Sequence, residues 1–93
     1  MKALSPDEVR GRLAKTPGWE LAGNSIRKRF RCADFKSAIA FVDKVAEIAE
    51  AANHHPDITI NFDRVTLALS THDAGGLTER DFALAAEIET VAP

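Results

Sequence analysis

The chain has 93 residues and a mass of 10.1 kDa, enough for one compact domain and too little for two. Hydrophobic residues make up 45% and charged residues 28%, proportions that exclude a disordered or collagen-like chain. The one cysteine, Cys32, can form neither an internal disulfide nor a CxxC motif, so a reducing, cytoplasmic location is expected. We therefore expect a single domain over residues 1–93.

The distribution of apolar and charged residues argues against a membrane or a nucleic acid as partner. The longest apolar runs, such as Phe82–Ala86, are far shorter than the roughly 20 residues of a membrane span. Proline and two acids by residue 8 leave no room for a secretory signal. Residues 1–36 hold nine basic and four acidic residues, whereas residues 37–93 hold three and ten. Such a charge dipole disfavours nucleic acid and permits head-to-tail contact between copies.

A helix followed by a hairpin is predicted at the start of the chain. Ser5 is a typical N-cap, and Glu8 is its capping-box partner, so a helix is expected over residues 6–14. Trp19 and Leu21 then begin an alternating pattern, and Gly23-Asn24 offers a two-residue turn. The alternation continues to residue 31 with basic side chains on one face, which indicates a second strand.

A long amphipathic helix is predicted from Phe35 to about Asn53, with Asp34 as its N-cap. Its apolar side chains cover an arc of about 180°, wider than the roughly 100° stripe that one sheet contact requires. We therefore expect part of this arc to contact another subunit. Pro56 disfavours helical geometry at His55, so the helix should end at or just before the histidine pair.

Two further strands and a last helix complete the expected fold. Alternation over residues 57–62 and again over 65–70 indicates two strands. A loop over residues 71–76 leads to Thr78, the expected N-cap of a helix that runs through Val91. The order α-β-β-α-β-β-α predicts an α+β domain: a four-stranded antiparallel sheet with three helices on one face.

Three histidines stand at the ends of predicted elements. His54 and His55 follow the long helix, and His72 follows the last strand. Histidine can donate and accept a proton near neutral pH, so a convergent set would support general acid–base catalysis. Three separate surface histidines are the plainer alternative. A three-histidine zinc site is a further one, but adjacent histidines seldom aim at one metal and no HxH or HxxxH spacing is present.

Two carboxylates, Glu50 and Asp81, are candidates for a role beside these histidines. Glu50 lies near the end of the long helix, where a negative charge opposes the helix dipole unless a group such as a histidine proton compensates. Asp81 falls on the inward face of the last helix, where a carboxylate needs a partner. Asp81 is also the third residue after Thr78, so a capping-box role is an equal alternative. A solvated Glu50 likewise remains open.

Trp19 is the only tryptophan, and two interpretations are open for it. One is a half-buried strand aromatic, and the other is a stacking wall for a flat heterocycle. The basic strand around Arg29 could contact phosphates, but the acidic remainder of the chain favours a solvated or subunit-facing strand. Cys32 is expected to be a small buried side chain.

The chain resembles the pterin-4a-carbinolamine dehydratases, also called the dimerisation cofactor family, over nearly its whole length and most clearly over residues 50–89. The most specific parts of the match are HHP at residues 54–56 and STHDAGGLTERD at residues 70–81, with GW at 18–19. This resemblance implies a dehydratase that needs no cofactor and acts on 4a-hydroxytetrahydropterin, the adduct that aromatic amino acid hydroxylases release. The spacing of the histidines separately leads us to expect no metal. It also implies a homodimer or homotetramer, formed through the long helix or a sheet edge.

The resemblance also implies roles for individual residues. Those that match catalytic positions are His54, His55, His72, Asp81 and Glu50. Those that match the pterin-binding parts are His54, His55, Pro56, Thr71, His72, Asp73 and Ala74, to which we add Trp19 as a candidate stacking wall. The chain departs from the family at Phe62, where many members have tyrosine, and at Ala51, where some have lysine. Neither departure touches the acid–base chemistry.

The expected function is therefore dehydration of a 4a-hydroxytetrahydropterin by histidine acid–base catalysis, in tetrahydropterin recycling. The alternative is a protein-binding module, because some family members stabilise a transcription factor dimer through a helix. Phe41 and Ile48, at the edge of the apolar arc, are the side chains expected to serve that role.

Overall fold

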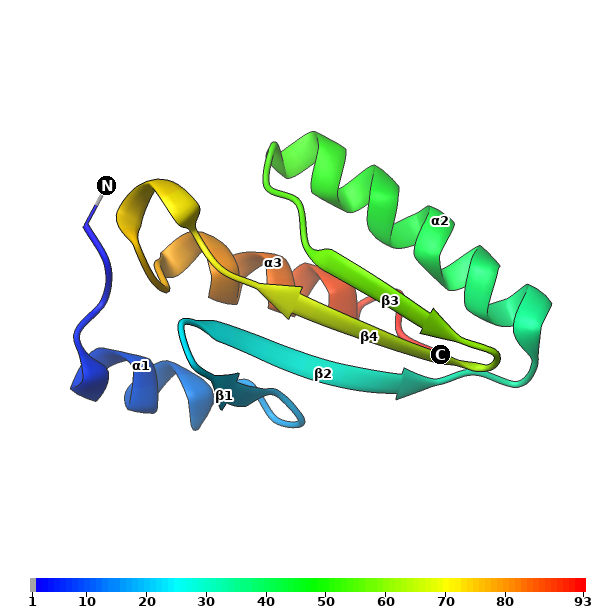
Figure 1. The fold of residues 1–93 in the computed structure, drawn as a ribbon, viewed down its shortest axis with the longest axis horizontal. Helices are drawn as coiled ribbons and strands as arrows, with labels where there is room; N and C mark the ends of the chain where they lie inside the picture. The colour runs from blue at the N-terminus through cyan, green and yellow to red at the C-terminus, as the bar shows by residue number, and fades with distance from the viewer. Residues whose placement is uncertain (1) are drawn as a thin grey trace.

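The structure, a computed structural model, describes residues 2–93. Its elements are α1 (Pro6–Leu13), β1 (Glu20–Ala22), β2 (Ser25–Arg31), α2 (Phe35–Ala52), β3 (Asp57–Asn61), β4 (Arg64–Leu69), the 3₁₀ helix η1 (His72–Ala74) and α3 (Glu79–Glu89). The four strands are antiparallel in the order β1-β2-β4-β3 (Figure 1). This confirms the predicted α-β-β-α-β-β-α fold.

Side-chain caps begin the three α-helices where the sequence predicts. Ser5 and Glu8 form the expected capping box, and Thr78 and Asp81 form a second one at the start of α3. The Asp34 carboxylate accepts a hydrogen bond from the Ser37 backbone N–H at 2.8 Å. Each cap satisfies N–H groups that have no partner inside the helix.

The two hairpins differ in how well alternation predicts them. Ala22 pairs with Ser25 around the expected Gly23-Asn24 turn. The prediction that β3 extends to Phe62 is wrong: Asn61 pairs with Arg64, so Phe62 and Asp63 form the turn. Phe62 has φ +55° and a side chain that is 67% exposed. Phe62 is apolar and so continues the alternating sequence pattern, but the last pair between β3 and β4 is Asn61 with Arg64, so β3 ends one residue before Phe62.

Smaller boundary differences occur at helix ends. α1 and α3 end at Leu13 and Glu89, one and two residues before the predicted ends. α2 ends at Ala52, because Asn53 adopts the left-handed conformation with φ 49°. The segment predicted as a loop after β4 contains a short 3₁₀ helix, η1. These shifts leave the order of elements unchanged.

The core lies between one face of the sheet and the helices. Its largest fully buried apolar side chains are Ile26, Leu67, Leu69, Leu84, Ile88, Val45 and Val65. Phe41 is also buried in this core, so the prediction that it serves a partner-binding edge is wrong. Burial raises the pKa of the Cys32 thiol, and the nearby charges of Asp63 and Asp34 raise it further. Cys32 is thus a core side chain, as expected.

Four apolar side chains of α2 and β3 remain exposed. Phe35, Ile39, Ile58 and Ile60, here called the α2–β3 strip, are each at least 36% exposed. Figure 1 shows α2 running beside β3, which is an edge strand of the sheet. No helix within residues 2–93 has the length and apolar character needed to cross a membrane.

Replacing Asp34 with alanine is expected to lower the melting temperature at neutral pH, because α2 loses its cap. Hydrogen bonding to the Ser37 backbone holds the pKa of Asp34 below its ordinary value. The stabilisation is therefore present above the unfolded-state pKa, about 3.9, and is lost as pH falls through the lower folded-state pKa. Thermal unfolding at about pH 6 and pH 2.5 should show the gap between wild type and variant shrinking in acid.

Asp34→Asn is the matched control, since asparagine caps a helix without a titratable charge. It should unfold near the wild-type temperature at neutral pH. A gap between wild type and Asp34→Ala that is the same at both pH values would contradict the charged-cap interpretation.

Candidate active site

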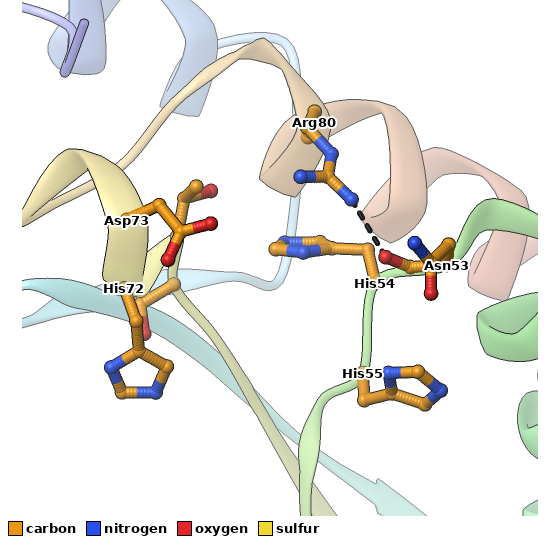
Figure 2. Close-up of a pocket in the computed structure, with 8 residues that line it drawn as sticks. Asn53, His54, His55, His72, Asp73 and Arg80 are labelled. Atoms are coloured by element: carbon orange, nitrogen blue, oxygen red, sulfur yellow. Dashed lines mark hydrogen bonds between the residues drawn. The ribbon is translucent and has the colours of Figure 1, made fainter. Parts of the chain in front are cut away.

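The ends of four elements surround a hollow of about 260 Å³. Its lining residues are Asn53, His54, His55, Ser70, Thr71, His72, Asp73 and Arg80. Figure 2 shows His72 and Asp73 on one side, His54 and His55 on the other, and Arg80 above His54. The structure thus brings the three histidines, which are distant along the chain, around one hollow.

The backbone at the end of α2 positions the histidine pair. The His54 N–H bonds to the Ala49 carbonyl at 3.1 Å, and the Asn53 N–H bonds to the Glu50 carbonyl at 3.2 Å. These two bonds, with Asn53 left-handed, form a Schellman motif that ends the helix. Arg80 of α3 donates to the Asn53 carbonyl at 2.7 Å, which ties this turn to the neighbouring helix (Figure 2).

A short closed loop holds the opposite wall. Thr71 and Gly76 form an isolated β-bridge, with the Thr71 N–H 3.0 Å from the Gly76 carbonyl. Between them, η1 places His72 and Asp73 at the hollow. Gly75 closes η1 with φ +71°, a conformation that a Cβ atom disfavours and that glycine, which has none, adopts readily. The loop therefore presents His72 from a backbone fixed at both ends.

Asp81 lies behind His54 rather than in the hollow. Its carboxylate has no exposed surface, and its Oδ1 is 2.6 Å from His54 Nε2. Its Oδ2 is 2.8 Å from the Thr71 hydroxyl and 2.9 Å from the Thr78 backbone nitrogen. Asp81 therefore closes the capping box, as predicted, and also contacts His54.

Glu50 contacts the second histidine of the pair. Its Oε2 is 2.5 Å from His55 Nε2, and both side chains are exposed. Glu50 lies at the outer edge of the site and does not line the hollow. The contact places a histidine beside a carboxylate that otherwise opposes the helix dipole.

The structure separates the remaining candidates from the hollow. Pro56 and Ala74 flank lining residues along the chain but do not line it themselves. Trp19 is buried in the core, where its ring lies edge-on to Phe30 with centroids 6.0 Å apart. Its Nε1–H donates to Glu89 at 3.0 Å. The prediction of Trp19 as a stacking wall is therefore wrong, because the first hairpin packs it under the end of α3.

Three lining residues escaped the sequence analysis: Asn53, Ser70 and Arg80. Asn53 carries a usable signal, since asparagine tolerates the left-handed cap that precedes the histidine pair. Arg80 carries none, because its partner is a backbone carbonyl 27 residues away. Within residues 2–93, no three His, Cys, Asp or Glu side chains gather as a metal site requires.

Comparison with known proteins identifies the family. The family model for pterin 4 alpha carbinolamine dehydratase matches residues 2–91. A protein of Chloroflexus aurantiacus, provisionally named a pterin-4-alpha-carbinolamine dehydratase, is 58% identical over 91 residues, covering 98% of each chain. One of Sulfurisphaera tokodaii with the same provisional name is 48% identical over 89 residues, covering 96% of each. The chain therefore belongs to the pterin-4a-carbinolamine dehydratase family.

Solved structures show the same fold. A Brucella melitensis protein described as a transcriptional coactivator/pterin dehydratase superposes with a TM-score of 0.94 at 30% identity, covering 99% of this chain and all of that one. A pterin dehydratase-like protein described as a RuBisCO assembly factor in the alpha-carboxysome gives a TM-score of 0.65 at 25% identity, covering 80% of this chain and 86% of that one.

Replacing Trp19 with phenylalanine tests its structural role. The variant loses the hydrogen bond to Glu89 and part of the ring volume, so its free energy of unfolding should fall by about 1–3 kcal/mol. Urea unfolding measures this loss. The NMR signals of the three histidines around the hollow should not change. Changed histidine signals in a folded Trp19→Phe protein would contradict the core assignment.

Proposed function

We propose that the protein dehydrates 4a-hydroxytetrahydropterins to quinonoid dihydropterins by histidine acid–base catalysis. The observation that carries this proposal is the convergence of His54, His55 and His72 around one hollow in a member of this family. Histidine is the side chain best suited to donate and accept protons at neutral pH.

The reaction requires two proton transfers. The C4a–O bond breaks and the oxygen leaves as water after receiving a proton, while N5 loses its proton. The electron pair of the N5–H bond becomes part of the C4a=N5 double bond. A donor and an acceptor on two sides of a flat ring would serve both transfers, and the histidines stand on two walls of the hollow (Figure 2).

Polar groups on the walls would hold the pterin. His72 and Asp73 present an imidazole and a carboxylate, and Arg80 adds a cation above His54. Pterin rings offer several hydrogen-bond donors and acceptors along one edge, which such groups can pair with. We assign the protein to tetrahydropterin recycling in the cytoplasm, where an aromatic amino acid hydroxylase would supply the substrate.

Binding to other proteins is a second candidate function. The α2–β3 strip leaves four apolar side chains exposed on neighbouring elements, and two structural relatives are described as a coactivator and an assembly factor. Ile48, expected to contact a partner, is half-buried against the core. Any such partner would therefore contact the strip rather than the pair Phe41 and Ile48.

A second copy of the chain is the partner that we propose for the strip. β3 is an edge strand whose five residues are all exposed, so it has unpaired backbone groups along one side. Pairing with the same strand of another copy would satisfy those groups and bury Ile58 and Ile60. In a two-fold symmetric dimer of this kind, the α2–β3 strip of one copy would contact the same strip of the other copy.

Two substitutions test the acid–base proposal. His55→Ala and His72→Ala should each lower kcat/KM by about 10²- to 10⁴-fold, a loss typical of a missing general acid or base. This equals about 2.7–5.4 kcal/mol of barrier. The decay of freshly made 4a-hydroxytetrahydropterin, followed by ultraviolet absorbance, measures the rate. Exhaustive chelation should leave the wild-type rate unchanged.

The control is Arg29→Ala, an exposed change on the open face of the sheet. It should keep wild-type activity and melting temperature. No acceleration over buffer by the wild type would exclude the proposed activity. Chelator-sensitive activity, or histidine variants within about threefold of wild type, would exclude the proposed mechanism.

A charge at the strip should separate the copies. Ile60→Lys places a charge on the edge strand, a device that natural proteins use to block edge pairing. Wild type should sediment as a dimer or larger at micromolar concentration, and the variant as a monomer. Leu21→Lys, the same apolar-to-lysine change on β1 at the other edge of the sheet, is the matched control. A monomeric wild type would contradict this proposal.

A further inference from the structure

A second hollow adjoins the hollow among the histidines, which is called the histidine hollow from here on. The second one, here called the hairpin hollow, has a volume of about 240 Å³. Its lining residues are Asn24, Ser25, Ser70, Thr71, His72, Gly75 and Gly76. Ser70, Thr71 and His72 also line the histidine hollow, so the two hollows share one wall. A molecule in the first hollow can therefore extend past His72 into the second.

The register of the sheet places two serines side by side at the hairpin hollow. The last residue pair of β2 and β4 is Ile26 with Leu69, so Ser25 and Ser70 are the next neighbours at this end of the sheet. Side chains alternate along a strand, and Ile26 and Leu69 are fully buried in the core. Ser25 and Ser70 therefore point to the open face of the sheet. Figure 1 shows the start of β2 and the loop after β4 at the same end of the molecule.

The loop after β4 leaves room opposite the serines. A Cβ atom added at Gly75 would meet no atom within 4 Å beyond its chain neighbours, so Gly75 borders open space. The bridge between Thr71 and Gly76 fixes the backbone of this loop at both ends. A small group of a ligand can thus lie beside Gly75 without displacing a side chain.

The side chains around the hairpin hollow suit hydroxyl groups of a ligand. A serine hydroxyl and an asparagine amide can each donate and accept hydrogen bonds. Asn24 is exposed and both serines are half-buried, and within residues 2–93 none of these three side chains makes a hydrogen bond. The lining residues within 2–93 include no leucine, isoleucine, valine or phenylalanine, which an alkyl or aryl chain would require. The hollow is therefore suited to a short, neutral, hydroxylated chain.

We propose that the hairpin hollow binds the side chain at C6 of the pterin, and that the preferred substrates carry a short hydroxylated chain there. This inference rests on the proposed function. C6 is bonded to N5, the atom that loses its proton, so a C6 side chain leaves the ring beside the histidines. His72 lines both hollows, so a chain that passes His72 reaches Asn24 and Ser25. These two residues determine specificity without contacting the reacting atoms.

Two pterins that do not undergo the reaction test this binding site. Dihydrobiopterin carries a dihydroxypropyl chain at C6, whereas 6-methyldihydropterin carries only a methyl group. In calorimetric titrations of the wild type, the dissociation constant of dihydrobiopterin should be at least about fivefold lower, because two neutral hydrogen bonds contribute this much or more. Equal dissociation constants for the two pterins, or binding of neither, would overturn the inference.

Ser25→Ala and Asn24→Ala remove the two polar side chains beyond His72. Each variant should weaken dihydrobiopterin binding by about 2- to 12-fold, the effect of one lost neutral hydrogen bond, and leave 6-methyldihydropterin binding within about twofold of wild type. Asn24 has no positive φ, so alanine fits the backbone of the turn. Variants that both keep the wild-type preference for dihydrobiopterin would overturn the inference.

Ser37→Ala is the matched control, a serine-to-alanine change in the first turn of α2, at the opposite end of this helix from the histidine pair. It should bind both pterins as the wild type does. A wild type that prefers dihydrobiopterin but does not accelerate the decay of 4a-hydroxytetrahydropterin would refute the proposed function and leave the side-chain site standing. An active dehydratase that binds both pterins equally would overturn the side-chain site and leave the proposed function standing.

Discussion

A carboxylate with no exposed surface constrains the functional end of this molecule. Removing a charge from water costs several kcal/mol unless hydrogen bonds and an opposite charge replace the lost hydration. Asp81 obtains its partners from the end of α2, the end of β4 and the start of α3. A shift of any one of these elements would remove one of the three partners of the carboxylate. Helix and strand ends that are distant along the chain are therefore held together by one side chain.

The same carboxylate serves local and tertiary structure at once. As the third residue of α3, it completes the Thr78 capping box. This role requires contacts only within the first turn of α3. The second oxygen, which a cap leaves free, reaches His54 of another element. In a chain of 93 residues most positions are needed for the core and for the ends of elements, so one side chain that has two roles is an advantage.

Local rules predict most of this fold and part of the site. Caps at Ser5, Asp34 and Thr78 are satisfied within three residues, so the sequence reveals them. The alternating pattern wrongly includes Phe62 in β3, because the end of a strand depends on its pairing with the partner strand. The burial of Trp19 could not be predicted either, because its hydrogen-bond partner Glu89 lies 70 residues away. The histidines could be placed at element ends, but only the tertiary fold shows which of them meets a buried carboxylate.

The order of strands in the sheet has a consequence for how the chain folds. Residues 20–31 and 57–69 each form a hairpin whose partners are near in sequence. The central pairing joins Ile26 to Leu69 and Arg31 to Arg64, partners more than 30 residues apart across α2. Closing so long a loop costs more conformational entropy than closing either hairpin, so we expect this central seam to form after the hairpins. Asp81 and the residues lining the histidine hollow all follow β2 in the chain, so α1 and the first hairpin supply none of them.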